Sequence, residues 1–321
     1  MPELLVVGEA LVEIMRPGVN LPLDEPGPFA GPYPSGAPAI AADALSLLGR
    51  QVGFIGAVGD DDFGRCIIRR LSADRVDVQY LRQVRDATTA MAFVTYFRDG
   101  SRRFLFHLRH SAAAYLNTDD VDDAYLRDVT YVHISGSTLA ISPVLQERCL
   151  RLVDRVIAHG GRLCFDPNFR PELLAPEVAR TDFAPFVQRA SVLLPTAAEA
   201  CWLTGEADPP AACQALLAAG PALVVLKQGA AGATAFTADG VTSAPGFAAE
   251  EVDPTGAGDC FAAALLVALL EGADLPRALR WANAGGALAV TRRGPMEGSP
   301  TRQALEAFLV RAGRRAHETA G

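Results

Sequence analysis

The sequence predicts an α/β fold: a doubly wound, mainly parallel sheet flanked by helices, with a small β-sheet lid. Three observations predict it. Short apolar runs alternate with amphipathic segments along most of the chain, a hairpin pattern interrupts this alternation once, and a glycine-rich turn precedes an apolar helix near the C-terminal end. A chain of 321 residues suffices for one large domain of this kind. We therefore expect a single domain over residues 1–321, with its ligand crevice at the carboxyl ends of the strands.

The apolar runs are short and bounded by turn residues, as strands buried on both faces are. Strands are expected at residues 4–8, 52–59, 130–136, 162–168, 191–195 and 222–229. Helices are expected at residues 38–48, 143–158, 209–219, 261–270, 277–293 and 301–314. This order of elements places helices on both faces of the sheet.

The hairpin pattern lies in MAFVTYFRDGSRRFLFHL, from Met91 to Leu108. Its two β-rich runs flank Asp99-Gly100, a dipeptide that tolerates the positive φ of a tight turn. Together with the Pro- and Gly-rich residues 9–34, it predicts a lid over the crevice, formed by about residues 9–34 and 88–110. An ordinary hairpin packed on the main domain fits the pattern equally well.

Composition narrows the class of protein. The net charge of −8 gives no electrostatic footprint for nucleic acid, and no apolar run reaches the roughly 18 residues of a membrane span. The six cysteines form no C-x-x-C pair and the five histidines no H-E-x-x-H motif, which argues against a disulfide framework and a zinc site. The opening residues read as a strand and not as a signal peptide. We expect a cytoplasmic protein whose partners are small molecules.

The single lysine of the chain, Lys227, is followed by Gln228, so the chain has no Walker A loop. The tripeptide DFG at residues 62–64 lacks the other motifs of a protein kinase, and we interpret it as coincidence.

The glycine turn DPTGAGD, from Asp253 to Asp259, directly precedes the apolar run FAAALLVALL. One interpretation is structural, because Asp is a favoured helix N-cap and its charge complements the helix dipole. The other is functional: Gly256, Ala257 and Gly258 would present bare backbone N–H groups at a helix start, an arrangement that binds phosphate. The turn alone does not decide between them.

Six segments in order resemble the ribokinase-like (PfkB) family of carbohydrate kinases, and nearest to its 2-keto-3-deoxygluconate kinase, fructokinase and tagatose kinase-like members. They are GEALVEI (8–14), SGAPAIAADALSLLG (35–49), GAVGDDDFG (56–64), FDPNFR (165–170), PTAAE (195–199) and DPTGAGD (253–259). The resemblance covers essentially the whole chain.

The resemblance implies an ATP-dependent phosphotransferase acting on a sugar hydroxyl. Asp259 would be the catalytic base, with Gly256, Ala257 and Gly258 as the anion hole that stabilises the transferring phosphoryl group. We expect positive surroundings to keep Asp259 ionised.

The resemblance also implies a nucleotide and metal site. Glu199 would hold Mg²⁺ through water, and Thr196 stands where the family usually has Asn, with helix capping as its structural alternative. Asp253 lies in the loop that a monovalent cation such as K⁺ orders in some members. The residues expected to flank ATP are Thr196, Lys227, Gly229, Gly232 and Asn283, the last with a surface role as the alternative.

Substrate contacts are expected from Glu13, Gly36, Ala37, Arg109 and Arg170. The two arginines resemble those of 2-keto-3-deoxygluconate kinases and favour a ketose or keto-sugar acid, although Arg170 could also pair with ATP phosphates or lie in solvent.

Two residues depart from the family pattern. Ile40 stands where many relatives have a sugar-binding Asn, and Ser35 replaces a Gly. Asp43, about one helical turn beyond Ile40, is expected to supply the missing acceptor.

Three other functions compete with a sugar kinase. A nucleoside kinase of the same fold would need a more apolar, aromatic pocket than Glu13, Asp43, Arg109 and Arg170 predict. A catalytically silent sugar or nucleotide sensor is opposed by the presence of Asp259. A Rossmann oxidoreductase is disfavoured because no G-x-G-x-x-G follows the first strand. Dimerisation through the lid is expected, since an exposed β face needs cover.

Overall fold

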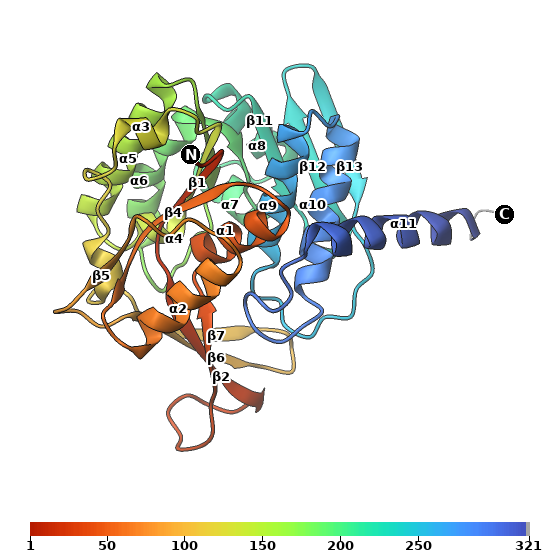
Figure 1. Cartoon of the computed structure of the whole chain (residues 1–321). Coiled ribbons are helices and arrows are strands. Elements are labelled where there is room, and N and C mark those ends of the chain that lie inside the picture. Colours follow the sequence, from red (N-terminus) through yellow and green to blue (C-terminus); the bar gives the residue numbers. More distant parts are fainter. Residues whose placement is uncertain (319–321) are drawn as a thin grey trace.

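The computed structural model describes residues 1–318, and it describes how exposed each residue is for residues 1–313. A nine-stranded sheet forms the centre of the molecule (Figure 1). Its strands, in spatial order, are β13 (Gly240–Pro245), β12 (Gly232–Thr237), β11 (Leu223–Lys227), β10 (Ala190–Leu193), β9 (Arg162–Asp166), β8 (Tyr131–Ser135), β1 (Leu4–Val7), β4 (Val52–Gly59) and β5 (Leu81–Val84).

The neighbouring strands from β11 to β5 all pair in parallel, whereas β12 pairs antiparallel with both β11 and β13, so β12 alone runs against the other strands. The predicted fold class is therefore confirmed, and all six predicted strands are present. The sequence reasoning missed β5, β12 and β13. Residues of β1 and β4 are buried throughout, because helices cover both faces of the sheet.

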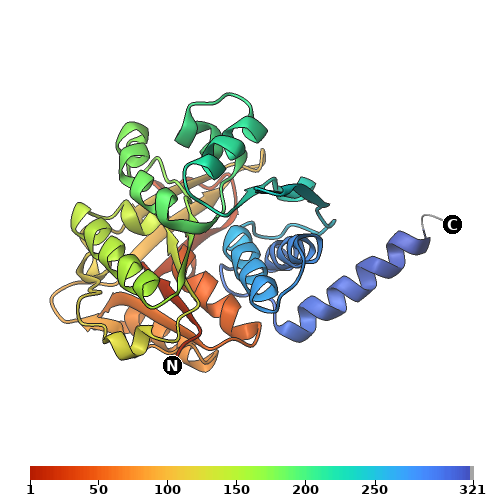
Figure 2. The same cartoon turned by 90° about the horizontal axis from the view of Figure 1, so that it is seen from above.

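Helices divide between the two faces. One face carries α1 (Ala37–Leu47), α2 (Asp62–Ala73), α9 (Ala257–Leu270) and α10 (Leu275–Ala289). The other carries η1 (Ala112–Tyr115), α3 (Asp123–Leu126), α4 (Gly136–Leu139), α5 (Pro143–Ala158), α6 (Pro176–Arg189), α7 (Ala197–Thr204) and α8 (Pro209–Ala218). Helix α11 (Arg302–Glu318) contacts α10 and then projects away from the body of the molecule (Figure 2). A short turn, η2 (Gly229–Ala231), joins β11 to β12.

A second, four-stranded sheet has the order β3-β2-β6-β7 and lies at the bottom of Figure 1. Its strands are β2 (Leu11–Val19), β3 (Ala30–Ser35), β6 (Ala90–Tyr96) and β7 (Arg102–His107). The predicted hairpin turn is present: Gly100 has φ 82°, and the Phe97 amide donates to the Ser101 carbonyl at 2.9 Å. The small second sheet predicted from the hairpin is thus confirmed.

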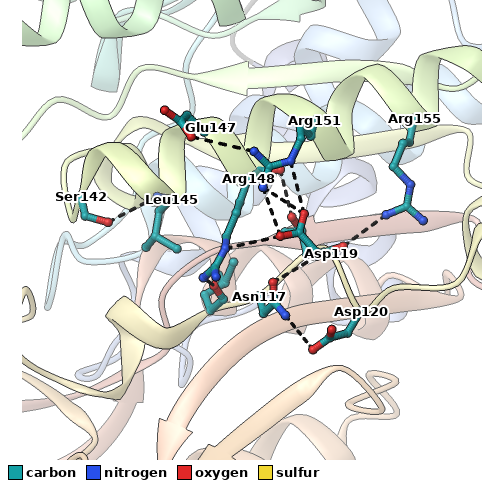
Figure 3. A network of polar contacts seen from close by, with 11 residues as sticks. Asn117, Asp119, Asp120, Ser142, Leu145, Glu147, Arg148, Arg151 and Arg155 are labelled. Atoms are coloured by element: carbon teal, nitrogen blue, oxygen red, sulfur yellow. Dashed lines mark hydrogen bonds and ion pairs between the residues drawn. The ribbon is translucent and has the colours of Figure 1, made fainter.

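The segment that returns from this sheet is tied to α5 by polar contacts (Figure 3). Arg148 and Arg151 of α5 both reach Asp119, and Arg151 Nη2 lies 3.0 Å from Asp119 Oδ1. Arg148 Nη1 also donates to the Leu116 carbonyl at 2.8 Å. Exposed pairs of this kind each contribute little stability. Together they hold the connection between the small sheet and β8.

Within the described part of the chain, no helix is both long and apolar enough to cross a membrane. The six cysteines carry free thiols, in agreement with the scattered spacing of these residues.

Candidate active site

A cavity of about 430 Å³ opens at the carboxyl edge of the large sheet, beneath the small one. Residues that directly follow β1, β8, β9, β10 and β11 line it, as expected for the crevice of a parallel α/β sheet. The small sheet therefore covers the crevice as a lid. The predicted residues that line this cavity are Glu13, Gly36, Ala37, Arg170, Thr196, Glu199, Lys227, Gly229, Gly256, Ala257, Gly258 and Asp259.

A second cavity, of about 590 Å³, adjoins the first. Five residues line both: Lys227, Gly229, Pro254, Ala257 and Gly258. Most of its other lining side chains are small or apolar, including Phe247 and Phe261, and the predicted residues Gly232 and Asn283 are among them. The two cavities therefore meet at the N-terminus of α9.

Helix α9 begins at a glycine. Gly256 is the N-cap, with φ 84°, and a Cβ there would come within 2.5 Å of the Pro295 carbonyl oxygen. Only glycine fits this position, because the left-handed backbone and the close contact both exclude a side chain. Asp259 is thus not the N-cap that one interpretation assumed, since it is the third residue of the helix. No side chain caps the helix, which leaves the first N–H groups directed at the junction of the cavities.

The Asp259 carboxyl group lies among charges of both signs. Burial and the carboxylate of Asp166 raise its pKa to about 7, against the opposing effects of Lys227 and Arg170. The expectation that positive surroundings keep Asp259 ionised was therefore wrong for the ligand-free protein. Its pKa instead lies in the range where a carboxylate accepts and returns protons at neutral pH.

Lys227 and Asp166 form a buried ion pair near the N-terminus of α9, with Lys227 Nζ 2.6 Å from Asp166 Oδ2. Burial lowers the pKa of Lys227, but Asp166 and Glu199 raise it by more, so the ammonium stays charged. Asp166 was not singled out from the sequence. It ends β9 beside β10, which the register of the sheet determines and the sequence does not.

Thr196 and Glu199 form a reciprocal capping box at the start of α7. Glu199 Oε2 accepts from the Thr196 amide at 2.8 Å, and the Thr196 hydroxyl accepts from the Glu199 amide at 3.3 Å. The other oxygen, Oε1, accepts from the Phe169 amide at 2.8 Å. The structural alternative, helix capping, is thus present, and both residues also line the first cavity.

Two buried glutamates line the first cavity, Glu9 just after β1 of the large sheet and Glu13 from β2 of the lid. Glu9, which sequence reasoning missed, accepts hydrogen bonds from the hydroxyls of Ser137 and Thr138 at 2.7 and 2.6 Å. Glu13 Oε2 accepts a long hydrogen bond, of 3.4 Å, from the Ser35 hydroxyl. Its other oxygen, Oε1, is buried without a hydrogen-bond partner among the described residues. Burial and then Asp253 raise the pKa of Glu13 to about 8. Ser35 thus brings a hydroxyl to the cavity.

Two predicted substrate residues lie elsewhere. Asp43, within α1, is fully buried and paired with Arg70 of α2 at 3.2 Å, and it is not among the residues that line either cavity. Arg109 is exposed and donates to the carbonyl of Leu173, outside the cavity lining. We correct both expectations. The lid arginine that does line the cavity is Arg102, seven residues earlier in the chain.

Asp253 and Asn283 each hold loops in place. The Asp253 carboxylate accepts from Tyr96 Oη at 2.9 Å and from the amides of Thr255 and Gly294, each at 3.0 Å. Asn283 Nδ2 donates to the carbonyls of Ala244 and Pro245, at the end of β13. Asn283 is buried and not a surface residue. No group of three or more potential side-chain metal ligands occurs among the described residues.

The fold and the paired cavities around a glycine-capped helix define a ribokinase-like kinase, a phosphotransferase that acts on a sugar hydroxyl. The family model for pfkB family carbohydrate kinases matches residues 1–302, up to the first residue of α11. The chain belongs to this family.

Relatives and solved structures agree with this assignment. The chain is 32% identical to fructokinase-2 of Zea mays over 315 residues, which cover 95% of this chain and 93% of that protein. It is also 32% identical to aminoimidazole riboside kinase of Salmonella typhimurium, over 96% of this chain and 95% of that protein. A structure described as a ribokinase II of E. coli, in complex with ATP and Mg²⁺, matches with a TM-score of 0.91 and 40% identity over 97% of this chain and 100% of that one.

Proposed function

We propose that this protein is an ATP-dependent kinase that transfers the γ-phosphoryl group to a hydroxyl of a ketose or keto-sugar acid, of the fructose, tagatose or 2-keto-3-deoxygluconate class. The observation that carries the proposal is the position of Asp259 in the first cavity, directly after Ala257 and Gly258, which line both cavities. The sugar would occupy the first cavity and ATP the second.

In this mechanism the sugar hydroxyl oxygen attacks the γ-phosphorus, and its proton passes to the Asp259 carboxylate. A new oxygen–phosphorus bond forms as the bond to the bridging β,γ-oxygen breaks, and ADP leaves. The amides of Gly256, Ala257 and Gly258 stabilise the charge on the transferring group. Lys227, held by Asp166, adds a positive charge at the same place.

ATP and a divalent metal are supported by the ligands of the E. coli structure. Among the described residues no three side chains are grouped as metal ligands, which suits Mg²⁺ carried in by the nucleotide, since this ion keeps several waters and binds mainly phosphate oxygens. Glu199 would contact its waters through the lone pairs that the capping box leaves free. When bound, Mg²⁺ neutralises charge on the β- and γ-phosphates. A monovalent cation such as K⁺ at the Asp253 loop remains part of the proposal.

The substrate class rests on the polar side chains of the first cavity. Glu9, Glu13 and Ser35 offer acceptors and a donor for hydroxyl groups, while Arg102 and Arg170 offer charged donors for a keto or carboxylate group. The arrangement fits a small polyhydroxylated molecule with an oxygen-rich end.

A nucleoside is the second candidate, because one observation favours it beyond the sequence. Phe104 and Phe106 of the lid are stacked, with ring centroids 5.3 Å apart, and both line the first cavity. Aromatic faces of this kind support a flat base. Aminoimidazole riboside kinase, itself a relative, acts on such a substrate by name.

The deciding experiment measures ADP release from ATP and Mg²⁺ with fructose, tagatose, 2-keto-3-deoxygluconate, ribose, adenosine and aminoimidazole riboside. We expect turnover with a ketose or keto-sugar acid, and a fall of roughly 10²- to 10⁴-fold in kcat for Asp259→Asn, because the proton acceptor is lost. Asp62→Asn is the matched control, since Asp62 also lies in the first turn of a helix but is 94% exposed and outside both cavities.

Turnover only with a nucleoside would replace the sugar by the second candidate. Full activity of Asp259→Asn would remove its assigned role. If no compound is phosphorylated while calorimetry detects binding of ATP and a sugar, the protein is a catalytically silent sensor.

A further inference from the structure

The lid touches the anion-hole loop directly. Tyr96, the last residue of β6, donates through its hydroxyl to Asp253 Oδ1 at 2.9 Å and lies 3.4 Å from Thr255 Oγ1. Arg102, the first residue of β7, donates through Nη1 to the same Thr255 hydroxyl at 3.4 Å. Two lid strands therefore meet one short loop, residues 253–255, immediately before the N-cap of α9.

The contacted carboxylate organises that loop. Asp253 is buried, and its two oxygens accept from the amides of Thr255 and Gly294, each at 3.0 Å. Thr255 is bonded covalently to Gly256, the N-cap, whose left-handed backbone packs closely against the Pro295 carbonyl. A shift of the Asp253 carboxylate would consequently move the amides that follow it.

The same two strands also form a wall of the sugar cavity. Ala92 of β6 and Arg102, Phe104 and Phe106 of β7 line it. Whatever occupies this cavity therefore acts on the strands that hold Tyr96. Burial, Glu13 and Asp253 all raise the pKa of the Tyr96 hydroxyl, so it keeps its proton and remains a donor at neutral pH.

We propose that Tyr96 is a positioning residue that couples occupation of the sugar cavity to the geometry of the anion hole, by holding the Asp253–Thr255 loop from the lid. Arg102 supports it through Thr255. The coupling assumes the proposed assignment of sugar to the first cavity and ATP to the second. Coupling of this kind is reciprocal: sugar should tighten nucleotide binding by the same factor as nucleotide tightens sugar binding.

The first test needs no substrate. Amide hydrogen exchange is compared in the ligand-free wild type, Tyr96→Phe and Thr95→Val. Tyr96→Phe removes only the hydroxyl, and we expect exchange at residues 255–258 to accelerate roughly tenfold, the effect of losing one hydrogen bond to a carboxylate. Thr95→Val is the control, because the Thr95 hydroxyl bonds within the lid, to the Leu21 carbonyl at 2.6 Å. Unchanged exchange in Tyr96→Phe would overturn the proposal.

The second test separates positioning from stability. With the sugar found active, Tyr96→Phe should lose roughly tenfold in kcat while the KM for sugar stays within about twofold, because the transition state needs the amides more than the ground state does. The tightening of Mg²⁺–ATP-analogue binding by sugar, measured by calorimetry, should fall toward onefold. A lower Tm with normal kcat and normal coupling would reduce Tyr96 to a structural role and contradict the proposal.

Thr255→Val provides a second route if Tyr96→Phe fails to fold. It removes the hydroxyl that both lid residues reach and leaves the lid and the Tyr96–Asp253 hydrogen bond unaltered, so a smaller loss of coupling in the same direction is expected. The two proposals fail separately. A wild type that phosphorylates nothing refutes the kinase assignment, whereas the exchange measurement still decides whether Tyr96 holds the loop.

Discussion

The charge state of one carboxyl group, Asp259, depends on a balance that its neighbours create. Burial and Asp166 raise its pKa, while Lys227 and Arg170 lower it, and the result is about 7. Asp166 therefore has two opposing effects: it keeps Lys227 in place, and it makes Asp259 a stronger base. A base with this pKa is half deprotonated at neutral pH and matched to proton transfer there.

This balance predicts the pH profile. As the pH falls below about 7, Asp259 gains its proton and can no longer accept one, so kcat/KM of the free enzyme should fall tenfold per pH unit. Above that pH the carboxylate is fully ionised and the profile should level off. Initial rates at subsaturating sugar, measured between pH 5 and 9, give kcat/KM over the acidic fall and the plateau of the profile. A midpoint near the ordinary Asp pKa of about 4 would show that the surroundings of Asp259 do not raise its pKa in the free enzyme.

Residues of the site differ in how far the sequence could predict them. Asp259 and the glycines before it form one contiguous motif, so their proximity needs no tertiary information. Glu9, Arg102 and Asp166 line the cavity because of the strand register and the position of the lid. Neither of these can be read from a single sequence. Asp43 was assigned wrongly for the same reason, because its partner Arg70 is 27 residues away on another helix.

Elements show a similar division. The buried parallel strands are continuous apolar runs and were all predicted. Strands β12 and β13 lie at the edge of the sheet and contain few large apolar residues, so their sequences show only a weak alternation. Asp239-Gly240, at the turn between them, is a hairpin signal that could have predicted the pair. Helix α9 begins at Ala257, four residues before the apolar run that predicted it, because a glycine turn supplies its first turn.

Helix α11 reaches the second cavity through one aromatic contact. Phe308 packs edge-to-face on Phe247, with ring centroids 5.2 Å apart, and Phe247 lines that cavity. Arg280 of α10 lies over the same Phe247 ring at 5.5 Å. The projecting helix thus buttresses a wall of the proposed nucleotide site.

Removing this buttress should weaken nucleotide binding selectively. Phe308→Ala is expected to raise the KM for ATP about 2- to 12-fold, the value of one aromatic pair, with the KM for sugar unchanged. Val310→Ala, on the same helix but 57% exposed, serves as the control. Equal values of the KM for ATP in both variants would show that α11 does not support the site.

At the scale of the whole molecule, the lid has an outer face without cover. Leu105 is 55% exposed and paired across the strands with Phe93, whereas the inward neighbours Phe104 and Phe106 line the cavity. We propose that a second copy of the chain covers this face, because an exposed apolar β face needs cover.

Leu105→Glu should then convert a dimer into a monomer, because a carboxylate would be buried in the contact. Light scattering coupled to size exclusion distinguishes the 33.9 kDa chain from its dimer. Arg103→Glu is the control variant, because it changes the charge of the same face without removing an apolar side chain. A wild type that is monomeric at all concentrations would disprove the contact.

The burial of Lys227 gives the molecule a chemical report on its own integrity. It is the only lysine in the chain, it lies where the two cavities meet, and it is buried in its pair with Asp166. An amine-directed reagent attacks an exposed, neutral amine, so it should leave this side chain unmodified while the ion pair is intact. Labelling of Lys227 would thus mark the opening of the junction, without an engineered probe.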